Sequence, residues 1–185
     1  RGKLFTKLIK EITTAARLGG GDPDGNPRLR KAINDAKAQH MPADTMKRAI
    51  QRGTGEIEGA NYDEVLYEGT GPSGTLFLVE GMTDNRNRTV AELRKIFERN
   101  NGVLGSSGTA GWAFDRLGTI SLEASAVTEE QLMEAALEAG AEDYRNEGDV
   151  WVVYTPVEDL FNVVAKFEEA KLPISESKIA YVPKT

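Results

Sequence analysis

Few residues in this chain are suited to catalysis. His40 is the only histidine and cysteine is absent, so a catalytic triad would have to be centred on His40. No G-x-S-x-G turn, H-E-x-x-H motif or P-loop accompanies it. His40 lies in an Ala-Gln-His-Met-Pro connection, where a surface or capping role is the simpler interpretation. The sequence therefore predicts no enzyme, no metal site, no cofactor and no small-molecule substrate.

A phosphate-binding glycine motif occurs once, at residues 69–74, which read Gly-Thr-Gly-Pro-Ser-Gly. A dinucleotide site of this type needs a helix directly after the glycines, because the helix N-terminus binds the pyrophosphate. Here the β-branched and aromatic run 75–82 follows instead. We therefore interpret the motif as the turn of a hairpin.

The cations of the first helical segment have a spacing that suits phosphate binding. At about 100° per residue, Lys7, Lys10 and Arg17 fall within about 40° of Lys3, opposite the apolar residues. Glu11 is the only acid in this segment. Soluble helices usually mix the two signs on their exposed face, so the ridge predicts contact with a polyanion rather than simple solvation.

A second group of polar side chains begins a later helix, at Asp84-Asn85-Arg86-Asn87-Arg88-Thr89. Guanidinium groups and amides at a helix N-terminus suit a phosphate or a base edge. Arg86 and Arg88 could equally pair with Glu80, Glu92 or the acidic C-terminal third of the chain. The full set of predicted nucleic-acid-binding residues is Lys3, Lys7, Lys10, Arg17, Arg28, Arg30, Lys31, Lys47, Arg48, Arg86 and Arg88.

Charge is distributed unevenly along the 185 residues, whose formal net charge is -6. Residues 1–53 carry twelve Lys and Arg against five Asp and Glu, a net charge of +7. Residues 54–117 have a net charge of -4, and residues 118–185 have -9. A nucleic acid is attracted to the first segment and repelled by the last.

Hydrophobic residues make up 39% of the chain and charged residues 28%, a composition typical of a globular protein. The longest apolar runs, such as 75–79 and 150–154, are too short to span a bilayer, and no signal segment opens the chain. We therefore expect a cytoplasmic protein without a membrane partner. The chain begins at Arg1 rather than Met, which suggests part of a longer gene product.

Three short helices are expected in residues 1–59. Apolar residues at helical spacing predict the first, over 3–17. Asn26 followed by Pro27 predicts an N-cap and the first residue of the second helix, which extends to about Gln39. Pro42 opens the third, which ends before Gly53. A glycine-rich, acidic linker follows over 53–63.

Residues 60–117 predict the order ββαββ. The strands are expected at 64–70, 75–82, 103–104 and 111–115. The helix between them begins with Asp84 or Asn85 as its cap, and its expected buried face is Val90, Leu93, Ile96 and Phe97.

Residues 118–185 predict the order βαββαβ, the ferredoxin-like arrangement. Both helices begin with a capping-box sequence, Thr128-x-x-Gln131 and Thr155-x-x-Glu158, and the second has Pro156 at its first position. We expect a four-stranded antiparallel sheet with both helices on one face. The fold class is therefore α+β, with an N-terminal helical domain followed by two α/β-sandwich domains.

Several segments together resemble the YebC/PmpR family, which includes a mitochondrial translational activator of a cytochrome oxidase subunit. The segments are residues 1–9, 19–23, 26–30, 67–69, 84–92 and 134–143. The resemblance implies the same three domains, with the ferredoxin-like one inserted within the second. It also implies further basic N-terminal residues and a C-terminal segment that completes the second domain.

The resemblance implies a role in gene expression, and leaves the target open between two nucleic acids. Some family members are described as DNA-binding transcriptional regulators, and others as ribosome-associated translation factors. The partner is therefore expected to be DNA or ribosomal RNA, with the ribosome as a further partner. A third hypothesis is that the ferredoxin-like domain is a small-molecule sensor module.

Overall fold

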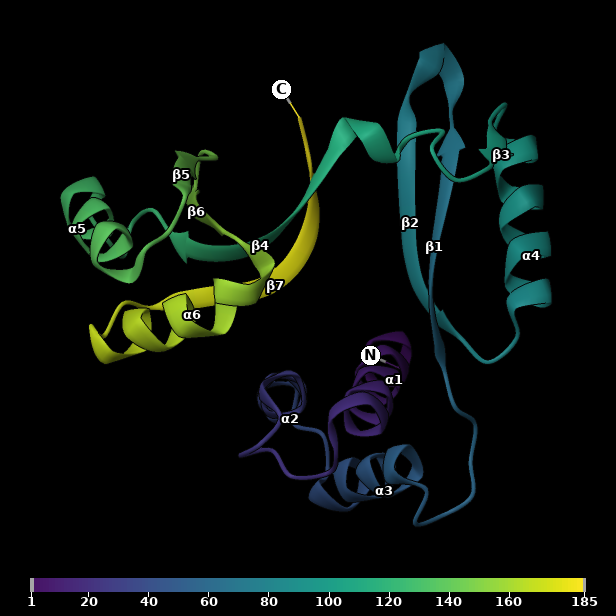
Figure 1. Cartoon of the computed structure of the whole chain (residues 1–185), viewed down its shortest axis with the longest axis horizontal. Coiled ribbons are helices and arrows are strands. Elements are labelled where there is room, and N and C mark those ends of the chain that lie inside the picture. Colours follow the sequence, from purple (N-terminus) through teal and green to yellow (C-terminus); the bar gives the residue numbers. More distant parts are fainter. Residues whose placement is uncertain (1, 185) are drawn as a thin grey trace. The chain divides into compact units, whose positions relative to one another are not determined.

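The computed structural model describes residues 2–184, and Arg1 and Thr185, which the sequence interpretation included, lie outside the described residues. The chain forms two compact units, Arg1–Gly111 and Trp112–Thr185 (Figure 1). The further division of the first unit into a helical domain and an α/β domain remains a prediction.

The first unit begins with the three expected helices, α1 (Gly2–Gly19), α2 (Pro27–Ala38) and α3 (Ala43–Thr54). Their core contains Ile12 and Ala16 of α1, Leu29 of α2 and Ala49 of α3, all nearly inaccessible to solvent. The helical spacing of the apolar residues predicted this burial, because it places them on one face of each helix.

The turn between α1 and α2 depends on Asn26, which caps α2 as predicted. Its Oδ1 accepts a hydrogen bond from the Leu29 amide at 3.1 Å. Its Nδ2 donates to the Ala15 carbonyl at 2.8 Å and to the Gly20 carbonyl at 2.9 Å. One buried side chain thus ends α1, starts α2 and joins the two helices.

Helices α1 and α3 pack closely at Gly53. A Cβ atom at this position would lie 2.3 Å from the Thr13 carbonyl oxygen and 2.8 Å from the Ala16 Cβ. Glycine is therefore required for the close approach of the two helices. The helix continues past Gly53, where the sequence predicted its end, and closes at Gly55 in the left-handed conformation.

The rest of the first unit is a three-stranded antiparallel sheet with one helix. Strands β1 (Asp63–Thr70), β2 (Leu76–Thr83) and β3 (Val103–Gly105) have the order β2-β1-β3. The turn Pro72–Gly74 joins β1 to β2, so the glycine motif at 69–74 is a hairpin turn, as predicted. Figure 1 shows α4 (Arg86–Arg99) running alongside these strands.

Two predictions for this region were wrong. Residues 111–115 do not form a strand of this sheet: Gly111–Ala113 is a 3-10 turn, and the strand that follows, β4 (Phe114–Glu123), belongs to the second unit. The expected buried face of α4 is not buried: 54% of Ile96 is exposed, and Val90, Leu93 and Phe97 are half-buried. A sheet of three strands, one of them only three residues long, is too narrow to cover the whole apolar face of α4.

The buried carboxylate of Glu68 fastens the loop that ends the first unit. It accepts hydrogen bonds from the amides of Gly108 at 2.7 Å and Ala110 at 2.9 Å, and also from that of Gly111. These backbone donors, Ala110 first, lower the pKa of Glu68. Glu68 therefore stays ionised and holds the loop against β1.

The second unit is ferredoxin-like, as predicted. Strands β4, β5 (Asp143–Asn146), β6 (Val150–Thr155) and β7 (Ile174–Pro183) form an antiparallel sheet in the order β5-β6-β4-β7. Helices α5 (Glu129–Ala139) and α6 (Leu160–Glu169) pack on one face of the sheet, because side chains from both helices share one core with Ile120 and Val153. The unit's first strand begins before residue 118, where the sequence placed the start of this domain: β4 and β7 pair from Phe114 to Leu122.

Only one of the two expected capping boxes forms. The Thr128 hydroxyl accepts from the Gln131 amide at 3.2 Å, and the Gln131 side chain accepts from the Thr128 amide at 3.0 Å. The Thr155 hydroxyl instead donates to the Pro156 carbonyl at 2.8 Å. Pro156 precedes a 3-10 turn, Val157–Asp159, which leads into α6, so the proline stands before the first turn and not inside it.

Candidate nucleic-acid interface

Three of the predicted binding residues are lysines whose charge is unopposed. Lys3 and Lys7 lie one turn apart on α1, and Lys47 lies on α3; all three are exposed. Within the described residues 2–184, none of the three forms an ion pair or a side-chain hydrogen bond. Their ammonium groups are therefore available to a ligand.

The other two members of the α1 ridge contact Tyr62, in the segment before β1. The Lys10 ammonium lies 5.3 Å from the centre of the Tyr62 ring, a cation–π distance. The Arg17 guanidinium donates to the Tyr62 carbonyl at 2.6 Å. The structure thus divides the ridge into an N-terminal half, Lys3 and Lys7, without a partner among the described residues, and a C-terminal half, Lys10 and Arg17, that contacts Tyr62.

Arg28, at the start of α2, is the most constrained of these cations. Its Nε and Nη2 lie 2.7 and 3.1 Å from the two carboxylate oxygens of Glu11, and Nη2 lies 2.6 Å from Glu64 Oε1. The side chain is about one-third exposed, at 35%. The hydrogen bonds that Arg28 donates to Glu11 raise the pKa of Arg28 further above its usual value, and this effect outweighs the lowering caused by burial. Two carboxylates already neutralise this residue.

Three more predicted residues have local partners. Arg30 donates to the carbonyls of Pro23 at 3.1 Å and Asp24 at 3.3 Å. Lys31 lies 2.6 Å from Asp35, and Arg48 lies 3.1 Å from Asp44. The residues of the last two pairs are one helical turn apart, and each such pair contributes roughly 0.2–0.5 kcal/mol to helix stability. Such pairs are readily exchanged for phosphate contacts.

The two arginines of α4 pair with acids other than those considered from the sequence. Arg86 Nε lies 3.3 Å from Asp63, and Arg88 lies 2.8 Å from Asp84. Asn85 is the N-cap and accepts from the Arg88 amide at 3.0 Å, so its side-chain oxygen is occupied. Neither Glu80 nor Glu92 is the partner.

Sequence reasoning missed the acceptors. Tyr62, Asp63 and Glu64 are consecutive, yet they bind cations of α1, α4 and α2 respectively. The segment was assigned to a linker and the start of a strand, and the local sequence carries no sign of these contacts. Adjacent acids at the end of a linker that follows a basic domain were the one available hint.

His40 lies in the connection between α2 and α3, as predicted. Its backbone has a positive φ of 59°, and its amide donates to the Lys37 carbonyl at 2.9 Å. The side chain is exposed. Among residues 2–184, no group of three or more His, Cys, Asp or Glu is arranged to hold a metal ion.

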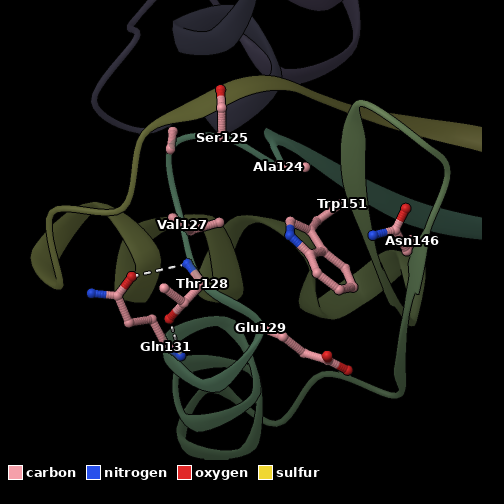
Figure 2. Close-up of a pocket in the computed structure, with 9 residues that line it drawn as sticks. Ala124, Ser125, Val127, Thr128, Glu129, Gln131, Asn146 and Trp151 are labelled. Atoms are coloured by element: carbon pink, nitrogen blue, oxygen red, sulfur yellow. Dashed lines mark hydrogen bonds between the residues drawn. The ribbon is translucent and has the colours of Figure 1, made fainter.

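The ferredoxin-like unit has a hollow of about 390 Å³ beside Trp151, lined also by residues 124–129, Gln131 and Asn146. Figure 2 shows Thr128 and Gln131 hydrogen-bonded to each other at its wall. These groups satisfy one another, and Glu129 is the one charged residue of the lining. The other polar side chains of the lining are Ser125 and Asn146.

Taken together, the fold and the surface define an α+β protein with a cationic three-helix region and an acidic ferredoxin-like unit. The chain matches the family model described as "TACO1/YebC protein N-terminal domain" over residues 1–56, and that described as "TACO1/YebC second and third domain" over residues 62–185. The chain belongs to the TACO1/YebC family.

Similar proteins cover almost all of the chain. A protein of Desulfosudis oleivorans named "Probable transcriptional regulatory protein" is 54% identical over 185 residues, which are 100% of this chain and 75% of that protein. One of Chloroherpeton thalassium with the same name is 61% identical over 161 residues, 86% of this chain and 64% of that protein. The crystal structure of the conserved hypothetical protein Aq1575 from Aquifex aeolicus matches with a TM-score of 0.91 and 46% identity, over 100% of this chain and 76% of that one. The α+β fold is thus that of a known structure.

No helix within residues 2–184 is both long enough and apolar enough to cross a membrane.

Proposed function

We propose that this protein is a regulator of gene expression that binds nucleic acid through its helical region, with DNA as the target and transcription as the process. The observation that carries the proposal is the pair of unopposed lysines on α1, Lys3 and Lys7, within a segment of net charge +7. Relatives named as probable transcriptional regulatory proteins support the same function.

The chemistry of the free cations favours contact with phosphates over base reading. An ammonium group is a compact point charge on a flexible stem, whereas the bidentate contact with guanine is usually made by arginine. The predicted arginines of this region, Arg17, Arg28, Arg30 and Arg48, bind carboxylates or carbonyls, whereas Lys3, Lys7 and Lys47 have no such partner within residues 2–184. Sequence preference would then come from a contact other than these lysines.

The acidic second unit supports the placement of the interface on the helical region. Residues 118–185 have a net charge of -9, which repels a polyanion. The proposed contact residues are the eleven predicted cations, with Lys3, Lys7 and Lys47 as those ready to bind without losing an existing partner. The proposed role is binding rather than catalysis, and the proposed location is the cytoplasm.

An experiment in cells identifies the target. Ultraviolet crosslinking of the tagged protein, followed by sequencing of the recovered nucleic acid, should yield promoter DNA. Recovery of ribosomal RNA instead would replace transcription by translation as the process. Recovery of neither, with the protein well expressed, would contradict the proposal. The Lys3→Gln, Lys7→Gln variant should lose most of the crosslinks, while Lys166→Gln, Lys171→Gln, with the same change of charge in the second unit, should keep them.

A further inference from the structure

Three consecutive residues, Tyr62, Asp63 and Glu64, connect the helical region to the sheet, and each is held by a cation. The Tyr62 carbonyl accepts from Arg17 at 2.6 Å and its ring lies 5.3 Å from the Lys10 ammonium. The Asp63 and Glu64 carboxylates are bound by arginines of α4 and α2. We call these three residues the clasp.

The clasp fastens three helices to the first strand. Arg17 and Lys10 come from α1, and the two arginines come from α2 and α4. The hydrogen-bonded residues are 23 to 45 positions apart in the sequence. All partners lie in the first unit. The clasp therefore holds the helical region against the start of β1.

The four cations of the clasp are also four of the eleven residues proposed to bind nucleic acid: Lys10, Arg17, Arg28 and Arg86. A guanidinium that binds a carboxylate has the geometry to bind a phosphate, since both anions accept the same paired N–H groups. Asp63 and Glu64 thus occupy the positions that phosphate oxygens would take. Both are exposed, with 58% and 53% of the side chain accessible, so a competing anion can reach them.

We propose that the clasp is an internal competitor for the phosphate-binding cations, and that nucleic-acid binding opens it. This inference rests on the proposed function and adds a regulatory step to it. In the free protein, the carboxylates of Asp63 and Glu64 reduce the affinity of the site. When phosphates displace them, the helical region is released from β1, and binding is coupled to the position of the sheet that follows.

The ion pairs are weak enough to exchange. An exposed ion pair typically changes an equilibrium constant by roughly 1.4- to 5-fold. The Arg28 pair with Glu11, which is about one-third exposed on both sides, remains when Glu64 is displaced. Opening therefore leaves α1 and α2 joined and releases only the contact to β1.

The test compares two variants with the same net charge. Asp63→Asn, Glu64→Gln removes both clasp carboxylates. The control, Glu56→Gln, Glu58→Gln, removes two acids from the same linker: Glu56 faces only Gln51 and Thr54, and Glu58 has no side-chain partner within residues 2–184. Affinity for a DNA duplex and for a polyphosphate chain is measured by fluorescence anisotropy over a range of salt concentrations.

The clasp variant should bind the duplex roughly 2- to 20-fold more tightly than the control variant. Added salt weakens the clasp ion pairs in the free protein as well as the phosphate contacts, so the log–log salt slope of the clasp variant, which has no such ion pairs to lose, should be steeper than that of the control variant. Hydrogen exchange of residues 56–64 should be faster in the free clasp variant than in the wild type, and should accelerate in the wild type when the duplex is added.

The proposed competition would be wrong if the clasp and control variants had equal duplex affinities and salt slopes and if hydrogen exchange of residues 56–64 did not change when the wild type binds. A wild-type protein that does not bind the duplex would contradict the proposed function instead. In that case polyphosphate tests the clasp independently of DNA binding. Faster hydrogen exchange of residues 56–64 when polyphosphate is added supports the competition, and unchanged exchange in polyphosphate-bound protein excludes the competition.

Discussion

The two unopposed lysines of α1 make a direct test of the interface. Lys3→Gln, Lys7→Gln removes two positive charges from an exposed helix face and breaks no ion pair or side-chain hydrogen bond within the described residues. Glutamine is a good helix former, so α1 should keep its stability. The other ridge members, Lys10 and Arg17, are left in place with their Tyr62 contacts.

The expected magnitude follows from counterion release. Each phosphate neutralised on a duplex contributes about -0.9 to the slope of log affinity against log salt concentration, and about -0.7 on a single strand. Loss of two contacts should flatten the slope by roughly 1.8 or 1.4 respectively. Between about 50 and 200 mM salt, the wild type should therefore lose about tenfold more duplex affinity than the variant.

Fluorescence anisotropy of a labelled duplex, titrated at several salt concentrations, measures the slope, and circular dichroism checks the helix content. The matched control is Lys166→Gln, Lys171→Gln, which has the same net charge but changes exposed lysines of the second unit. Its slope should equal that of the wild type. An unchanged slope in the folded Lys3 and Lys7 variant, or an equal flattening in the control, would refute the assignment of the interface to α1.

Three further predictions concern stability. Asn26→Ala should lower the free energy of unfolding of the first unit by about 2–4 kcal/mol in chemical denaturation, because it removes a cap and two buried carbonyl partners; Asn26→Asp keeps the acceptor but places a carboxylate oxygen against the Ala15 and Gly20 carbonyls, so it should destabilise the unit at least as much. The pKa of Glu68 is lower in the folded state than in the unfolded state. The ionised carboxylate therefore stabilises the fold above its unfolded pKa, and this stabilisation is lost as the pH falls through the folded pKa. Glu68→Gln should weaken the acid dependence of the melting temperature, and an identical dependence in the variant and the wild type would contradict the loop contact. Phe167→Ala should destabilise the second unit by about 3–5 kcal/mol in thermal unfolding, with little change in duplex affinity measured below the transition.

Much of the fold could be predicted from the sequence, because its signals are local. The Asn26 cap and the Thr128 capping box are formed by residues three apart, and both appear in the structure. The periodicity of apolar residues predicted α1, and the order of the last six elements predicted the ferredoxin-like sheet. Each of these depends on a short stretch of chain, within which backbone geometry decides which side chains meet.

Two of the errors have a common cause, which is that an element's extent and burial depend on what packs or pairs with it. Phe114 begins β4 because it pairs with Pro183 in β7, a partner at the other end of the unit. Ile96 is exposed because the sheet beside α4 is narrow. Thr155 had the right spacing for a capping box but forms a local bond to Pro156 instead.

Composition and helical periodicity are enough to show that the cations concentrate in the first 53 positions and that those of α1 share one face. Which of these cations are available to a ligand depends on contacts with distant parts of the chain. Lys3 and Lys7 have no partner among the described residues, whereas Arg17 and Arg28 contact the clasp, 45 and 36 residues away. Helical periodicity fixes the direction of a side chain relative to its own helix. The partner it meets is set by the path of the rest of the chain, which brings Tyr62–Glu64 back to three helices, and no spacing within α1 encodes that path.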